Sequence, residues 1–172
     1  MGSVRASKPI GFIIAFLCVF LNFVPMIFCL LGAIVPSWVY GTFLNFLFNG
    51  AEFLQVVSVP IILFGAVLAA WASRKLGQQA SDAPIVREKH NLITTGPYSR
   101  IRHPGYTARM IIDFGVLLLL FNTLQFISLL TWIGLAHRKA VLEEELLASE
   151  DGFGKDYSDY MLRTGRFLPR LR

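Results

Sequence analysis

The sequence predicts an all-α fold, a multipass integral membrane helix bundle with about four transmembrane helices. Hydrophobic residues make up 55% of the 172 residues and charged residues only 16%, whereas an average soluble domain carries about 25% charged residues. The charges are also segregated, because no Lys or Arg lies between residues 9 and 71. Since basic residues concentrate on the cytoplasmic side of membrane helices, both termini are expected in the cytoplasm, and the lipid bilayer is the expected environment.

The net charge of +5 does not predict a nucleic acid partner. Apart from Arg109, the basic residues stand at the N-terminus, within 74–102 and from residue 138 onward, so they flank the apolar runs. The three histidines (His90, His103 and His137) are far apart in the sequence and lack the spacing of metal ligands, so no metal site is expected.

The N-terminal part, residues 1–73, is expected to form transmembrane helices. A membrane helix needs about 20 apolar residues, and the segments 10–31 and 53–72 each satisfy this length with no Lys or Arg. The first is interpreted as a retained span, because it is longer than the apolar region of a signal peptide. The short aromatic segment 37–48 between them fits the outer interface, or forms a fifth short helix.

The C-terminal part, residues 74–172, begins with a polar loop and continues with an apolar region at 106–136. As a single helix, this apolar region would be about 46 Å long, too long for one crossing of a hydrocarbon core of roughly 30 Å. Asn122 and Thr123 near its middle are typical of a tight turn. We therefore expect a helical hairpin with both ends on the cytoplasmic side, followed by a charged helical tail.

Two polar clusters flank the predicted hairpin. The first, residues 96–106, reads GPYSRIRHPGY, and the second, residues 138–144, reads RKAVLEE. Polar and charged side chains beside hydrocarbon are costly and usually functional. Because both ends of a hairpin lie on one side of the membrane, the two clusters are expected to meet.

The motifs GPYxxxRHPxY, an apolar hairpin, Arg/Lys followed by EExxL, then YxxY and R-F-x-P together resemble the isoprenylcysteine carboxyl methyltransferase family. That family belongs to a wider set of integral membrane methyltransferases, which includes the phospholipid methyltransferases. The resemblance covers residues 76–169. It implies that 74–172 is the catalytic region, with S-adenosylmethionine bound in a cytoplasmic pocket. It also implies a lipophilic acceptor such as a prenylated or lipid molecule, most simply a carboxylate.

The resemblance also implies the residues that contact the cofactor. An aromatic face stabilises a cation such as a sulfonium by roughly 0.5–2 kcal/mol, and a carboxylate suits the cofactor's amino group. Carried over by motif, these residues are His90, Asn91, Leu92, Ile93, Tyr98, His103, Pro104, Gly105, Tyr106 and Glu143.

The acceptor is expected to meet a cation, Arg138 or Lys139. The family places an Arg four residues before the first Glu of the EE pair, and here that position is Lys139, which lacks the bidentate fork of Arg. If the acceptor is an amine, Glu143 or Glu144 is the nearest candidate general base. Arg109 either lies at the substrate mouth or pairs with Asp113 four residues later.

Three other functions remain open from the sequence. A phospholipid, amine or thiol methyltransferase would share the same fold. A membrane sterol-type reductase would use NADPH in place of S-adenosylmethionine. A non-catalytic membrane protein would bind neither cofactor.

Overall fold

The computed structural model describes residues 48–77 and 92–170 continuously, and nearer the N-terminus only 5–6, 13, 16–17, 23, 27 and 30–37, with 85–86 in the loop. Most of the predicted first span and of the 37–48 segment therefore lies outside the described residues. The positions that are described from 13 to 34 are helical.

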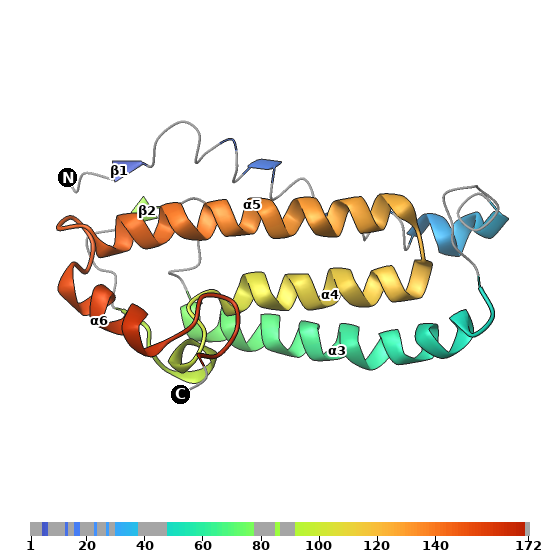
Figure 1. The fold of residues 1–172 in the computed structure, drawn as a ribbon, viewed down its shortest axis with the longest axis horizontal. Coiled ribbons are helices and arrows are strands. Elements are labelled where there is room, and N and C mark those ends of the chain that lie inside the picture. The colour runs from blue at the N-terminus through green and yellow to red at the C-terminus, as the bar shows by residue number, and fades with distance from the viewer. Residues whose placement is uncertain are drawn as a thin grey trace.

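The described part is helical, as predicted, apart from one very short antiparallel pair. Its elements are β1 (Arg5–Ala6), α3 (Ala51–Leu76), β2 (Ile85–Val86), a 3-10 helix (Gly96–Ser99), α4 (Pro104–Leu120), α5 (Thr123–Ala148) and α6 (Lys155–Arg163). In β1 and β2, Arg5 pairs with Val86 and Ala6 with Ile85. The three long helices lie side by side with α4 in the middle, and α6 crosses one end (Figure 1).

The predicted pair of helices is confirmed, with its turn where Asn122 marks it, while the cytoplasmic location of its two ends stays a prediction. Helix α4 ends at Leu120, and Phe121 adopts a left-handed conformation with φ 44° and ψ 49°. Asn122 then caps α5, because its side-chain oxygen accepts a hydrogen bond from the backbone N–H of Leu124 at 2.8 Å. A short polar side chain that satisfies a free helix N–H is the usual start of a helix.

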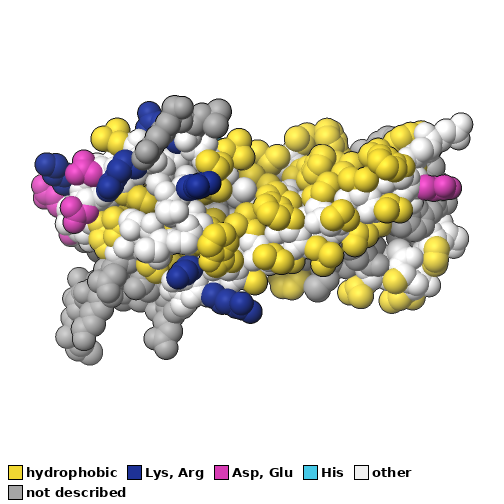
Figure 2. Space-filling view, turned by 90° about the horizontal axis from the view of Figure 1, so that it is seen from below, with side chains coloured by type: hydrophobic (Ala, Val, Ile, Leu, Met, Phe, Trp, Pro, Cys, Tyr) yellow, Lys and Arg dark blue, Asp and Glu magenta, His cyan; other side chains and the backbone are white. Residues whose placement is uncertain are grey.

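Within 48–77 and 92–170, α3 is the one helix that is long and apolar enough to cross a membrane by length and composition. It contains the whole of the predicted 53–72 span. Large apolar side chains on α3, including Phe53, Val56 and Val67, are 66–71% exposed. Figure 2 shows hydrophobic side chains along the length of this face, with most charged side chains gathered at one end. This distribution is that of a helix whose outer face meets hydrocarbon.

Helices α3 and α4 pack closely because glycines lie at their contacts. A Cβ atom on Gly65 would lie 2.7 Å from Cγ1 of Ile112, and one on Gly115 would lie 2.5 Å from Cγ1 of Ile62. Small residues allow backbones to approach in this way. The space between α4 and α5 is instead filled by larger side chains around Trp132 and Ala136, namely Tyr106, Met110 and Leu135.

Candidate functional site

The two polar clusters meet at the end of the hairpin, as the sequence predicts. The Tyr106 hydroxyl on α4 donates a hydrogen bond to Oε1 of Glu143 on α5 at 2.7 Å. His103, directly before Pro104 at the first position of α4, has Nδ1 3.4 Å from Glu143 and Nε2 3.2 Å from Glu144. Proline suits the first turn of a helix because no N–H is needed there. The His103 ring is thus fixed at the start of α4, facing α5.

His103 lies between two carboxylates, and this geometry favours its protonated form. Each ring nitrogen can contact its carboxylate favourably only as an N–H donor, which requires the imidazolium. Burial lowers the pKa of His103, but the hydrogen bonds and charges of Glu143 and Glu144 outweigh burial and leave that pKa raised. The ring also stacks on Tyr106 with centroids 5.3 Å apart and planes 5° apart.

Glu144 is the centre of a buried ion cluster. Its carboxylate accepts hydrogen bonds from Arg102 Nε at 2.8 Å and from Arg166 Nη2 at 2.6 Å, besides the contact with His103. Burial raises the pKa of Glu144, but the donors His103, Arg166 and Arg102 more than offset it and hold that pKa well below its usual range. A carboxylate held this way is a poor proton acceptor, so the general-base role expected of Glu144 does not fit its contacts.

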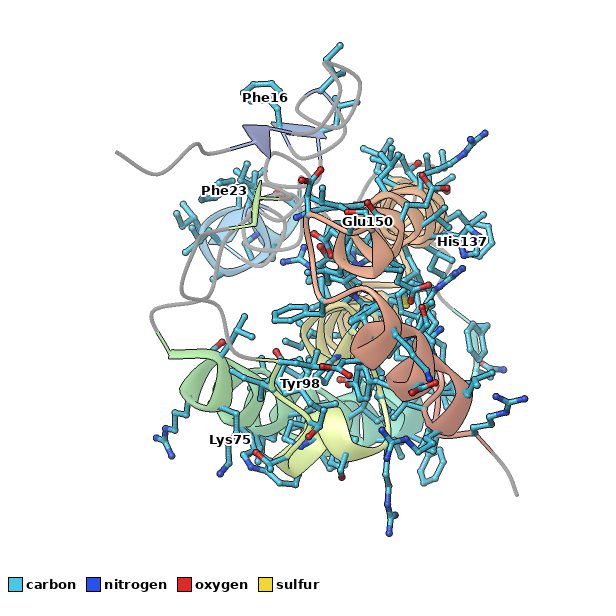
Figure 3. The ribbon with its side chains drawn as sticks, turned by 90° about the vertical axis from the view of Figure 1, so that its left-hand side faces the viewer. Phe16, Phe23, Lys75, Tyr98, His137 and Glu150 are labelled. Atoms are coloured by element: carbon cyan, nitrogen blue, oxygen red, sulfur yellow. The ribbon has the colours of Figure 1, made fainter. Side chains whose placement is uncertain are left out.

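Lys139, and not Arg138, points toward the polar cluster. The Lys139 residue is 3% exposed, and its ammonium lies 3.9 Å from Oε1 of Glu143 and 5.1 Å from the centroid of the Tyr106 ring. Arg138 and His137 are exposed on the other side of α5, and His137 lies at the periphery in Figure 3. Of the two cations that the sequence left open, Lys139 is therefore the one that lies against Glu143 and Tyr106.

Arg109 lies about one turn after Tyr106 on α4 and forms the pair with Asp113 that was one of its two alternatives, while a role at the substrate mouth stays a prediction. Its Nε donates a hydrogen bond to Oδ2 of Asp113 at 2.9 Å, and its guanidinium carbon is 5.9 Å from the centroid of the Trp132 ring. Asp113 is 1% exposed. The pair lowers the cost of an acidic group in an apolar helix.

The remaining cofactor candidates lie on the segment before α4. Tyr98 stands in the 3-10 helix and is half-buried. Burial, and then the nearby charge of Glu143, raise its pKa to about 12, so its hydroxyl stays protonated beside that carboxylate. Leu92 and Ile93 are half-buried in an irregular segment.

The other candidates differ in how far they can contribute a side chain. Pro104 is buried at the start of α4. Gly105 is exposed, and no described atom would meet a Cβ there within 4 Å. His90 and Asn91 lie outside the described residues.

The C-terminal tail is part of the site, which the sequence did not predict. Arg102 N–H donates to the carbonyl of Gly165 at 2.8 Å and His103 N–H to that of Arg166 at 3.0 Å, while Gly165 N–H donates to Arg100 at 3.1 Å. Arg102 and Arg166 belong to the RHP and R-F-x-P motifs, and these motifs were the signal in the sequence that pointed to the two segments. Their partner Glu144 could not be deduced without the fold.

A comparison with protein families finds a match over the hairpin region. The family model for the isoprenylcysteine carboxyl methyltransferase family matches residues 57–149, just over half of the chain. These residues include α4, the hairpin and both members of the Glu143–Glu144 pair. The matched region therefore contains most of the cluster, but not the tail that closes it.

Curated relatives named protein-S-isoprenylcysteine O-methyltransferase include a protein from Xenopus laevis and one from human. The Xenopus laevis protein is 29% identical over 148 residues, covering 81% of this chain and 50% of the relative. The human protein is 27% identical over 148 residues, covering 81% and 51%. The chain thus spans about half the length of these relatives.

A solved structure shares the fold. It is described as the eukaryotic intramembrane Ras methyltransferase, isoprenylcysteine carboxyl methyltransferase, and superposes with a TM-score of 0.63. It is 21% identical and covers 90% of this chain and 51% of the solved one. The family model matches more than half of the chain, and the solved structure has the same fold. The chain belongs to the isoprenylcysteine carboxyl methyltransferase family.

Proposed function

We propose that the protein is a membrane methyltransferase that uses S-adenosylmethionine to form a methyl ester on the carboxylate of a lipophilic acceptor. The single observation that supports this most is the group of His103, Tyr106, Lys139 and Glu143, which lie in contact at the end of the hairpin away from its turn. A prenylated cysteine, the substrate in the relatives' names, is the simplest such acceptor. The C-terminal region would supply a cofactor pocket on the cytoplasmic side.

The side chains present fit this cofactor. Glu143 has one short hydrogen bond, from Tyr106, and longer contacts to His103 and Lys139 at 3.4 and 3.9 Å. A carboxylate offers about four acceptor positions, so Glu143 retains capacity for the amino group of an amino acid. Tyr106 already has Lys139 against its ring, which leaves Tyr98 as the aromatic face for a sulfonium.

Lys139 is assigned to the acceptor carboxylate. When bound, S-adenosylmethionine supplies a methyl group on a positively charged sulfur; the acceptor oxygen forms the new C–O bond, and the electron pair of the broken S–C bond stays with sulfur. A carboxylate acceptor carries no proton to remove, so no general base is required. Lys139 would hold this carboxylate in place, and such positioning contributes greatly to rate.

The charges of the cluster favour an anionic acceptor over an amine. Arg102, His103, Lys139 and Arg166 carry positive charge, against the negative charges of Glu143 and Glu144. Four cations against two anions leave an excess of two positive charges, with His103 protonated. Beside Lys139 this excess attracts an acceptor carboxylate, whereas the amino group of the cofactor is assigned to the carboxylate of Glu143. Glu144 is assigned to anchoring the tail.

The first prediction tests the cofactor site. Replacing Glu143 by Gln should weaken binding of S-adenosylhomocysteine by about 10–100-fold, because a hydrogen bond to a charged group contributes about 1.5–3 kcal/mol. Isothermal titration of purified protein measures this. Glu150→Gln, an exposed carboxylate beyond α5, is the matched control and should bind as the unmodified protein does. Equal binding by both variants contradicts the cofactor assignment.

The same preparation tests Lys139 against its neighbour. Lys139→Met should keep S-adenosylhomocysteine binding but lower kcat/KM for an S-prenylated N-acetylcysteine by about 10–100-fold, since the charged contact to the acceptor is lost. Arg138→Met, on the exposed side of α5, should change kcat/KM little. If Arg138→Met is the defective variant, Lys139 does not orient the acceptor.

A further inference from the structure

The end of α6 and the residues after it form a surface that is both basic and apolar. We call it the tail edge, and its members are Leu162, Arg163, Leu168 and Arg170. Residues 160–170 include three arginines and no acidic residue. The two leucines are 68% and 73% exposed, and the two arginines are exposed as well. Exposed leucines beside arginines have the composition of a segment that lies at a membrane surface.

The members of the tail edge lie close together in the fold. Nη1 of Arg170 donates a hydrogen bond to the carbonyl of Leu162 at 2.5 Å, which brings the chain back to the end of α6. A Cβ atom on Gly165 would lie 3.2 Å from the backbone nitrogen of Arg170, so the tail folds back closely at this glycine. The end of α6 and residues 168–170 therefore lie side by side.

The two arginines of the tail edge keep their charge available. Nε of Arg163 donates to the carbonyl of Asp159 at 3.2 Å, and the contact of Arg170 also ends on a carbonyl. Within 48–77 and 92–170, neither guanidinium forms an ion pair. The third arginine, Arg166, differs because it pairs with Glu144. Since a guanidinium has five N–H donors, each arginine of the tail edge retains donors for an anion.

The packing of α3 on α4 relates the depths of the two helices. A Cβ atom on Gly65 would lie 3.0 Å from the backbone oxygen of Ala108, and Gly115 lies against Ile62, so the two helices run in opposite directions. From Gly65 to Trp71, α3 rises by about 9 Å. The same distance on α4 leads from Ala108 back to the first turn. Trp71 and the first turn of α4 therefore lie at about the same depth.

This depth is the boundary between hydrocarbon and headgroups. Helix α3 carries exposed apolar side chains as far as Trp71, followed by Arg74 and Lys75, and a tryptophan with basic residues beyond it is typical of a membrane interface. The tail joins α4 at this level, because Thr107 Oγ1 donates to the carbonyl of Phe167 at 2.7 Å. Figure 2 shows Lys and Arg side chains where the apolar body meets the polar end. The tail edge therefore stands at the membrane surface.

We propose that the tail edge binds anionic phospholipids, with its arginines on the phosphate groups and its leucines in the adjoining hydrocarbon. An acidic protein segment in the cytoplasm would match the arginines but leave the leucines exposed, whereas a lipid covers both. A zwitterionic headgroup also carries a phosphate, but its own cation repels a guanidinium, so the surface selects lipids with net negative charge. The proposal concerns the bilayer around the protein and does not depend on the methyl acceptor.

Native mass spectrometry of the full protein in detergent measures the Kd of the first phosphatidylglycerol and of the first phosphatidylcholine that bind. The unmodified protein should bind phosphatidylglycerol more tightly. The double variant Arg163→Gln with Arg170→Gln should weaken that binding at least about fivefold, the factor that corresponds to about 1 kcal/mol, the contribution of one basic residue near an anionic surface. Binding of phosphatidylcholine should change little.

A matched control separates the tail edge from the general charge of the polar end. Arg100→Gln with Lys155→Gln removes the same charge from exposed positions at the same end and should leave phosphatidylglycerol binding unchanged. Arg163→Lys with Arg170→Lys keeps the charge and should retain most of the preference, which separates lipid binding from the hydrogen bonds within the tail. If the two glutamine pairs weaken binding equally, the preference comes from net charge and the proposal is wrong.

The leucines are tested by thermal stability. A lipid that binds the folded protein stabilises it, so phosphatidylglycerol should raise the melting temperature of the unmodified protein more than phosphatidylcholine does. Leu162→Ser with Leu168→Ser should lose most of this extra rise while its melting temperature in detergent alone stays the same. If the two lipids raise the melting temperature of the unmodified protein equally, the tail edge selects no anionic lipid, and the proposal is wrong while the proposed function stands.

Discussion

At the scale of single residues, two adjacent glutamates have different environments. Glu143 has one short hydrogen bond and two long contacts, whereas Glu144 is enclosed by Arg102, His103 and Arg166. The EExxL motif gives no sign of this difference. Adjacent residues on a helix point about 100° apart, so one faces the α4 arm and the other the tail.

Glu144→Gln should destabilise the protein by about 2–4 kcal/mol at pH 6, since it leaves two guanidinium groups beside a neutral amide. Glu145→Gln, at an exposed neighbouring position, should change stability little. Thermal melting of the protein in detergent measures both. Equal melting temperatures for the two variants would show that the Glu144 cluster contributes no net stability.

The difference in stability between the unmodified protein and Glu144→Gln should depend on pH in two directions. The pKa of Glu144 is lowered on folding, so its contribution is present above the unfolded value of about 4.5 and is lost as the pH falls below it. The pKa of His103 is raised, so its contribution is present below the unfolded value of about 6.5 and is lost as the pH rises through the folded value. The difference should be largest between these two pH values. A flat profile would contradict the His103–Glu144 interaction.

At the scale of elements, the helical hairpin could be predicted and the tail pairing could not. The length of the 106–136 run and the polar pair at 122–123 depend only on local sequence. The pairing of 100–103 with 165–166 joins segments more than 60 residues apart, and no periodicity encodes it. The buried polar side chains of α5 could not be predicted for another reason: Gln125 and Ser128 are visible in the sequence, but whether they face lipid or α4 depends on the rotation of α5.

The contact between α3 and α4 should tolerate no added side chain at Gly115. A Cβ there would meet Cγ1 of Ile62 at 2.5 Å and the Ile62 backbone nitrogen at 3.3 Å, so Gly115→Ala should destabilise by about 1–3 kcal/mol. Gly134→Ala on α5, where no described atom lies within 4 Å, should be neutral or stabilise by up to about 1 kcal/mol. Shifts in melting temperature of opposite sign are expected. A stable Gly115→Ala would mean that the helices are further apart.

At the scale of the whole molecule, the charges divide the bundle into an apolar body and one polar end (Figure 2). The turn between α4 and α5 lies at the end of the bundle opposite α6 (Figure 1), and Asn122 and Glu143 belong to opposite ends of α5. A chain with this division has its polar end at one membrane surface. Four crossings with cytoplasmic termini remain the prediction from the sequence.

Topology can be measured by labelling single cysteines introduced at Asn49, Asn122 and Glu150. The first two precede helices at the end away from the polar cluster, so a membrane-impermeant maleimide should label Asn49→Cys from outside the cell. Asn122 is buried, so the Asn122→Cys variant should be labelled from outside the cell only after mild unfolding. The Glu150→Cys variant should be labelled only from the cytoplasm. If the first two positions are labelled from the cytoplasm alone, the predicted orientation in the membrane is wrong.

The pairing of the tail with the segment before α4 also affects how the molecule is made. Residues 100–103 leave the ribosome long before residues 165–166, and the whole hairpin is synthesised in between. Until the tail emerges, Glu144 lacks Arg166 and the Arg102 backbone lacks its partner at Gly165. A nascent chain that already spans the bilayer therefore has an unfinished polar end. The polar end can therefore be completed only after the whole hairpin and the tail have been synthesised.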